Sequence, residues 1–234
     1  MIQTKNELNQ YLLEEIGPPI GLLSNIKDFI VKNEGYYLRK YIRTLRYLEY
    51  YMNTSDNKWH KLLAVVYKIK LKRLSHITKI ELYPNKVGKG LTLFHITGDK
   101  QGAVPHAVIG EHVILRPGTV LGYNGDSMRE NLKSPKVGDY VEFSWGVKVF
   151  GNIKIGRGAL LNANCVPLSN VPPYAIVAGN PAKVIGFTKT PEEAHQFEVE
   201  RYPDSEWTPV DVLEKNYEKY FSSKLKDIKS FVKM

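Results

Sequence analysis

Hydrophobic positions between residues 109 and 178 recur every six residues. The first position of nearly every row is aliphatic or aromatic, at Ile109, Leu115, Leu121, Val137, Phe143, Val149, Ile155 and Leu161. The fifth is small or β-branched, at Val113, Thr119, Gly125, Val141, Val147, Ile153, Ala159, Cys165, Val171 and Val177. A helix repeats near 3.6 residues and a flat strand at 2, so neither explains this period. It predicts stacked coils with three flat sides, each side a short strand and a corner.

An ordinary β-sandwich is the alternative, but seven unbroken rows from Val137 argue against it. The flanking segments instead carry apolar residues at helical spacing. We therefore predict a mainly β chain in three parts. These are a helical N-terminal domain (1–79), a domain of coils (80–186) and a helical C-terminal tail (187–234).

Charge narrows the possible partners only slightly. The chain has 234 residues and a formal net charge of +9, which suits nucleic acid, anionic lipid or phosphorylated cofactors. The Tyr- and Arg-rich stretch from Tyr36 to Tyr51 could form a nucleic-acid surface, but a packed helix with a solvated basic side explains it as well. There is no signal-peptide pattern, no apolar run near the ~20 residues of a membrane span, and a single cysteine. We expect a cytoplasmic protein.

The stretch LTLFHITG (91–98) holds the first candidate for chemistry. Strict strand alternation would bury His95 beside Leu91 and Leu93. The six-residue register instead makes Leu93 a first position and puts His95 at a corner, facing outward. The period therefore favours an accessible histidine over a core one.

These features resemble the hexapeptide-repeat acyltransferases, whose fold is a left-handed parallel β-helix. The segment VPPYAIVAGNPAKVIG (171–186) is similar to the signature that ends their prism. Over 80–186 the chain resembles the serine acetyltransferase branch and its relatives in surface-polysaccharide gene clusters. The matching segments are VGKGLTLFH (87–95), LGYNGDS (121–127) and SPKVGDYVEFSWGVKVFGNIKIG (134–156). The basic helical N-terminus before IELYPNKVGKGL is most similar to the polysaccharide relatives.

The resemblance implies direct acetyl transfer from acetyl-CoA, used as a co-substrate. His95 would be the general base that takes the proton of the acceptor hydroxyl. Glu81 would hold the imidazole tautomer and stabilise the imidazolium. Backbone near Gly146 and Cys165 would bind the pantetheine arm, with Cys165 otherwise a structural filler.

The resemblance also implies how the nucleotide is held and how subunits assemble. Lys183 would reach its phosphates, and Lys148 could assist. The cofactor groove needs a neighbouring prism, so a homotrimer with sites between subunits is expected. We expect no metal, because His106 and His112 have no third histidine nearby in the sequence.

Two departures from the serine enzymes affect the predicted acceptor. Phe94 stands where they have an acidic residue, and Lys133-Ser134 stands where they have Arg-His. These three residues are the candidate substrate-binding set. We therefore predict an O-acetyltransferase acting on a sugar hydroxyl in polysaccharide biosynthesis, with a small-molecule or glycan acceptor and possible peripheral contact with a membrane-linked one. The alternatives are a serine O-acetyltransferase of cysteine biosynthesis and a non-catalytic scaffold that binds nucleic acid; we expect no nucleic acid.

Overall fold

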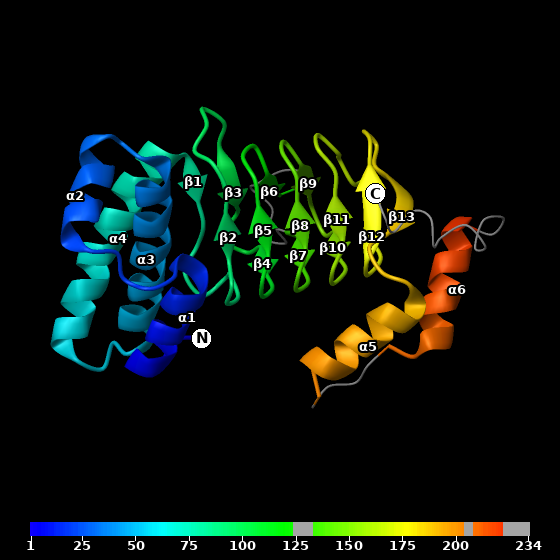
Figure 1. Cartoon of the computed structure of the whole chain (residues 1–234), viewed down its shortest axis with the longest axis horizontal. Coiled ribbons are helices and arrows are strands. Elements are labelled where there is room, and N and C mark those ends of the chain that lie inside the picture. Colours follow the sequence, from blue (N-terminus) through cyan, green and yellow to red (C-terminus); the bar gives the residue numbers. More distant parts are fainter. Residues whose placement is uncertain (124–132, 204–207, 222–234) are drawn as a thin grey trace.

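The computed structural model describes residues 1–123, 133–203 and 208–221. It begins with four helices, α1 (Lys5–Ile16), α2 (Leu22–Ile30), α3 (Glu34–Asn53) and α4 (Lys58–Thr78). Short strands follow, from β1 (Ile80–Glu81) to β13 (Lys183–Phe187), and the chain closes with α5 (Pro191–Arg201) and α6 (Val210–Phe221). Figure 1 shows the strands stacked in order along the long axis, between the two helical groups.

The strands form three sheets that run along the sides of a prism, as the six-residue period predicted. One sheet contains β1, β3 (Gln101–Ala103), β6 (Val120–Gly122) and β9 (Lys148–Phe150). The second contains β4 (Val108–Ile109), β7 (Lys136–Val137) and β10 (Lys154–Ile155). The third contains β2 (Thr92–Leu93), β5 (Ile114–Leu115), β8 (Glu142–Phe143), β11 (Leu160–Leu161), β12 (Ala175–Ala178) and β13.

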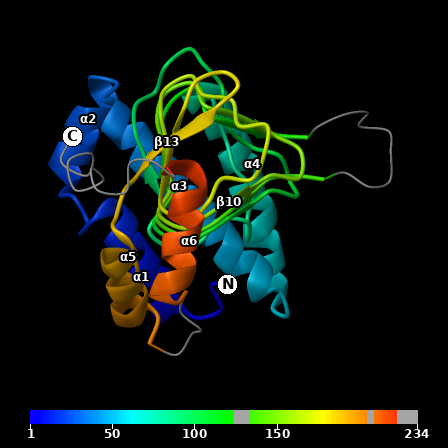
Figure 2. The same cartoon turned by 90° about the vertical axis from the view of Figure 1, so that its right-hand side faces the viewer.

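Pairing is parallel throughout these sheets except between β12 and β13, which are antiparallel. Leu93 pairs with Leu115, which pairs with Phe143, which pairs with Leu161. Each coil therefore lies directly on the previous one, and the coils overlap when the prism is seen end-on (Figure 2). The architecture is a parallel coil of three sheets.

Burial confirms both predicted columns wherever they are described. All eight first-position side chains are buried, and so are the fifth-position side chains except Gly125, which lies outside the described residues. Glycine meets two different requirements at these corners. Gly146 has a φ of 73°. At Gly138 the reason is close stacking, since a Cβ there would lie 2.8 Å from the backbone nitrogen of Arg157.

A buried ion cluster joins the N-terminal helices to the first coil. Arg46 of α3 is fully buried and donates to Glu15 of α1 (2.6 and 2.9 Å) and to Glu49 of α3 (2.9 Å). The same guanidinium donates to the backbone carbonyls of Val87 (2.9 Å) and Gly88 (2.6 Å). Because these contacts cross from helix to coil, they fix α3 against the strand that leads to His95.

The C-terminal helices are anchored to the last coils. The hydroxyl of buried Tyr174 donates to Glu198 of α5 at 3.0 Å. Phe187 of β13 stacks on Tyr217 of α6, with ring centroids 3.6 Å apart. The change from helix to strand and back falls close to residues 79 and 187. The division into three domains stays a prediction. Within the described ranges, no helix is long and apolar enough to cross a membrane.

Candidate active site

His95 lies at the corner that follows β2, as the register predicted. Leu91 and Leu93 are buried, whereas the His95 side chain is 51% exposed. Its φ of 54° lies in the left-handed region, which turns the chain sharply at the end of the strand. The sequence thus places an imidazole on the outside of the prism, where a substrate can reach it.

The partner of His95 comes from the helical segment, and no sequence signal pointed to it. Glu34, the first residue of α3, has its Oε1 3.0 Å from His95 Nδ1. Its Oε2 accepts a hydrogen bond from the backbone N–H of Ile96 at 3.1 Å. Asn33 caps α3 by accepting from Gly35 N–H, which fixes where the helix begins. No motif links Glu34 to His95, since 61 residues separate them.

The structure does not bring Glu81 to His95 as predicted. Glu81 lies in β1, in a different sheet from β2, and its Oε2 is 2.6 Å from the ammonium of Lys100. The hydroxyl of Tyr83 donates to its other carboxylate oxygen at 3.1 Å. The hydrogen bond from Lys100 lowers the pKa of Glu81. The predicted contact is therefore corrected to Glu34, and a catalytic role for Glu81 stays a prediction.

Phe94 and side chains from the next two coils form a wall beside His95. Phe94 is exposed next to it, and the guanidinium of Arg116 lies 5.3 Å from the Phe94 ring centroid. The ring of Trp145, also exposed, has its centroid 5.6 Å from that of His95. Arg116 Nη1 donates to Glu142 at 2.5 Å. The wall thus combines aromatic faces with a charged pair, close to a histidine and a carboxylate.

The predicted cofactor residues occupy neighbouring coils. The N–H of Lys148 donates to the carbonyl of Cys165 at 3.1 Å, and a Cβ on Gly146 would collide with the Oδ1 of Asn164. Burial raises the pKa of the Cys165 thiol to about 11, which suits a filler and not a nucleophile. The Lys148 ammonium donates to the carbonyl of Gly118, so it is engaged within the coil.

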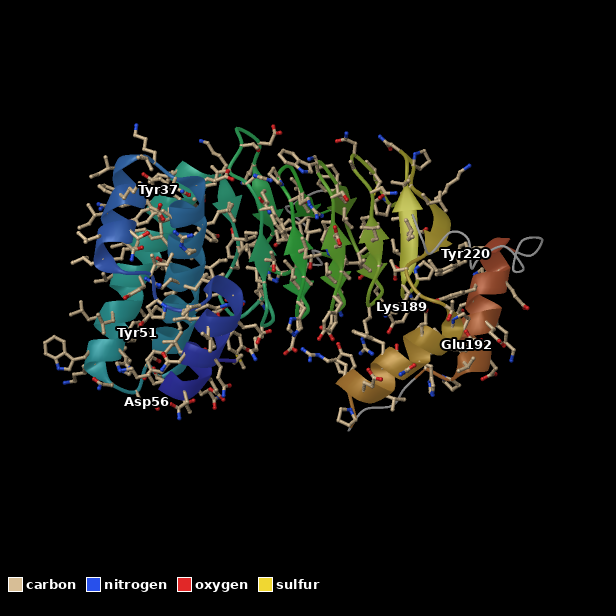
Figure 3. All side chains as sticks on the ribbon, in the orientation of Figure 1. Tyr37, Tyr51, Asp56, Lys189, Glu192 and Tyr220 are labelled. Carbon is tan, nitrogen blue, oxygen red and sulfur yellow. The ribbon has the colours of Figure 1, made fainter. Side chains whose placement is uncertain are left out.

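Lys183 is exposed at the start of β13, beside an open groove. Asn170, Val171 and Tyr220 also line this groove. Tyr220, on α6, projects toward β13 in Figure 3. An exposed ammonium at the rim of a groove fits the predicted contact with nucleotide phosphates.

Lys133 and Ser134, the remaining predicted site residues, directly follow residues 124–132, which lie outside the described ranges. Lys133 is exposed and Ser134 is buried just before β7, while residues 124–127 of LGYNGDS lie outside the described ranges. In the described part of the chain, no three histidine, cysteine or acidic side chains are grouped as a metal site would need. The roles of Lys133 and Ser134 in substrate binding stay predictions.

Comparison with known proteins relates the chain to serine acetyltransferases. Serine acetyltransferase 4 of Arabidopsis thaliana is 40% identical over 128 residues, which are 54% of this chain and 34% of that protein. The chain spans about a third to under a half of the first curated relatives it matches. A crystal structure of serine acetyltransferase in complex with coenzyme A from Brucella abortus strain S19 aligns with a TM-score of 0.57 and 26% identity. That alignment covers 78% of this chain and 69% of the other. No family model matches the chain.

These findings overturn the prediction of a sugar acceptor. The matched relatives and structures are serine acetyltransferases, which agrees with the alternative prediction, and the polysaccharide branch gains no support. The prediction rested on Phe94, which stands where an acidic residue was expected, and on Lys133-Ser134, which stand where Arg-His was expected. The sequence around Phe94 does not reveal that α3 brings a different carboxylate, that of Glu34, to His95.

A bacterial relative matches over most of both chains. Serine acetyltransferase of Staphylococcus aureus (strain Mu50) is 30% identical over 173 residues. The match covers 72% of this chain and 79% of that protein, so it extends beyond the coils into the helical segments. The chain belongs to the serine acetyltransferase family.

Proposed function

We propose that this protein is an acetyl-CoA-dependent O-acetyltransferase whose acceptor is the hydroxyl of L-serine. The observation that carries the proposal is the exposed His95 with its Nδ1 held 3.0 Å from Glu34, in a chain of this family. A carboxylate only accepts hydrogen bonds, so this contact selects the tautomer with hydrogen on Nδ1. The lone pair is then on Nε2, which is the atom that takes the substrate proton.

The proposed reaction is one direct transfer. His95 Nε2 removes the proton as the serine hydroxyl oxygen attacks the thioester carbonyl carbon of acetyl-CoA. The new C–O bond forms, the C–S bond breaks, and the coenzyme A thiolate takes the proton back from the imidazolium. Glu34 stabilises the imidazolium while it exists. Buried Cys165 has no part in this sequence.

The charges around His95 suit an amino-acid acceptor. Glu34 is half exposed and retains acceptor positions for the ammonium group of serine. Arg116 carries several N–H donors, of which Nη1 is bonded to Glu142, and we assign it to the serine carboxylate. Phe94 and Trp145 would exclude water from the reacting atoms. A carboxylate and a guanidinium on neighbouring elements thus replace the polar residues that the sequence lacks.

Coenzyme A would lie along the coils. The backbone at Gly146 and Cys165 would hold the pantetheine arm, and Lys183 would reach the phosphates from the rim of its groove. The Lys148 ammonium donates to the carbonyl of Gly118, which makes Lys148 a weaker candidate than Lys183 for contacting the phosphates. We infer a homotrimer with sites between subunits, coils that wind left-handed, and a cytoplasmic location, as the resemblance implies.

The test is thiol release from acetyl-CoA, measured with and without L-serine. We expect His95→Ala to lower serine-dependent turnover by about 10² to 10⁴, the usual worth of a general base. Glu34→Gln should lose about tenfold or more in kcat because the tautomer is no longer fixed. Glu81→Gln is the comparison variant, and it should stay near wild type if Glu34 and not Glu81 supports His95.

Two results would count against these assignments. A loss in Glu81→Gln with full activity in Glu34→Gln would restore the original pairing of Glu81 with His95. Thiol release that does not depend on L-serine at any concentration would remove serine as the acceptor.

A further inference from the structure

The helical end of the molecule carries a basic pocket whose lining does not include His95 or Glu34. The pocket opens between α2, α3 and α4, and those three helices form the end of the molecule opposite α6 (Figure 1). Its charged lining consists of Arg39, Lys40, Arg43 and Lys70. Asp28 pairs with Arg39 at 2.7 Å, which leaves an excess of positive charge around the opening.

Aromatic rings hold two of these cations in place. The Lys40 ammonium lies 5.1 Å from the ring centroid of Tyr36, and the Lys70 ammonium lies 4.7 Å from that of Tyr67. Both rings line the same pocket. The pocket is therefore a concave site with positioned cations, which is the chemistry that binds a phosphate group.

The helix beside this pocket, α2, is largely apolar and exposed. No residue of α2 is buried against the described part of the chain. Leu23 is 84% exposed and Ile30 is 70% exposed, with Leu22, Ile26 and Phe29 also exposed. Phe29 lies against Tyr36 of the pocket, with ring centroids 5.7 Å apart. Exposed apolar side chains thus continue directly from the edge of the basic pocket.

The neighbouring helix α4 repeats the combination of apolar and basic side chains. Its exposed apolar residues Leu62, Val65, Val66 and Ile69 follow helical spacing, so they form one stripe. The helix contains no acidic residue, and its cations are Lys58, Lys61, Lys68, Lys70, Lys72 and Arg73. Two such helices would repel each other across a self-interface. The cations of α4 favour an anionic partner, and its exposed apolar stripe favours a partner that also has an apolar region.

We propose that this end of the protein binds the surface of a membrane that contains anionic phospholipids. Lipid phosphates occupy the pocket between α2, α3 and α4, and the apolar side chains of α2 enter the interface between headgroups and acyl chains. The lysines of α4 add attraction to the negative surface.

Sedimentation of the full-length protein with lipid vesicles tests the proposal. We expect binding to phosphatidylcholine vesicles that contain phosphatidylglycerol, and little binding to phosphatidylcholine alone. Arg43→Gln with Lys70→Gln should weaken binding by about 10- to 30-fold. Leu23→Gln with Ile30→Gln, both highly exposed, should weaken it by about tenfold or more without affecting folding. The matched control is the double variant Lys136→Gln with Lys154→Gln. It removes the same amount of charge from two exposed lysines on the coils.

Four outcomes would overturn the proposal. One is equal binding to neutral and anionic vesicles. The second is a loss as large in the coil control as in the pocket variant, which would indicate general attraction of a basic protein. The third is that the α2 variant binds vesicles normally but has a lower assembly mass by analytical ultracentrifugation, which would assign α2 to contact with a second copy. Binding of inorganic phosphate in the pocket without vesicle binding would likewise show a soluble ligand in place of a membrane.

Discussion

Replacing Arg46 tests how the helices hold the coil that carries His95. The side chains of Arg46 and Glu15 are fully buried, and that of Glu49 is nearly so. Arg46→Met would leave two carboxylates in a buried site without their counter-charge. It would also remove the donors to the carbonyls of Val87 and Gly88. Breaking a buried ion pair from one side costs about 3–5 kcal/mol, so we expect a loss of unfolding free energy in that range at neutral pH.

The same variant should show a specific pH dependence. Burial already raises the pKa of Glu49, and Arg46 opposes that rise. Without Arg46 the pKa of Glu49 in the folded protein should rise further. A carboxyl whose folded pKa exceeds its unfolded pKa stabilises the fold at low pH and loses that stability as the pH rises through the folded pKa. The destabilisation should therefore be larger at about pH 8 than at about pH 5.

Urea unfolding followed by circular dichroism at both pH values measures the effect. The variant Arg46→Met with Glu15→Gln and Glu49→Gln should regain most of the loss, because it leaves no buried charge. Its amide oxygens can still accept from the N–H groups of Leu91 and Asn85. Arg39→Met, which breaks a partly exposed pair with Asp28, should cost about 1 kcal/mol or less. A cost for Arg46→Met as small as that for Arg39→Met, or one that does not change with pH, would refute the reasoning.

Three further predictions concern the coils and the C-terminal helices. Cys165 should not react with a thiol reagent in the native protein at about pH 8, because its pKa is raised to about 11, and it should react once urea unfolds the chain. Gly146→Ala should lower the thermal midpoint and cost about 1–3 kcal/mol, because φ is 73° and the new Cβ would meet Asn164. Tyr174→Phe should cost about 1–2 kcal/mol by removing a buried hydrogen bond to Glu198, and limited proteolysis should then cut α5 and α6 away sooner. An unchanged thermal midpoint in Gly146→Ala, or proteolysis of Tyr174→Phe at the wild-type rate, would contradict the last two.

The coils could be predicted from sequence because their contacts repeat at a fixed distance along the chain. Leu115 packs on Leu93 and Phe143 packs on Leu115, so one register places every buried side chain in the column. The same register correctly predicts that His95 faces outward. In a nearest-neighbour architecture, local spacing determines most of the packing.

The contacts between helices and coils could not be predicted in this way. Arg46 reaches Gly88 across 42 residues, and Glu34 reaches His95 across 61. Neither contact repeats, and neither belongs to a motif. Their positions depend on how α3 packs against the first coil, which is set by side-chain fit and not by period. The basic pocket between α2, α3 and α4 also depends on how the helices pack, so the sequence did not predict it.

The position of Glu34 explains why the acceptor was predicted wrongly. When only the motif position is compared, Phe94 replaces the acidic residue of the serine enzymes, and a negative charge is lost. Electrostatic recognition depends on where a charge lies in space, and a carboxylate from any element can serve the same substrate group. At the proposed site, the first residue of a capped helix would provide that carboxylate, directly beside the histidine. Because Arg46 fixes α3 against the first coil, loosening its cluster should also displace Glu34. Arg46→Met with both glutamates replaced should therefore keep its stability yet lose part of its serine-dependent activity, and equal activity would show that α3 holds Glu34 without this cluster.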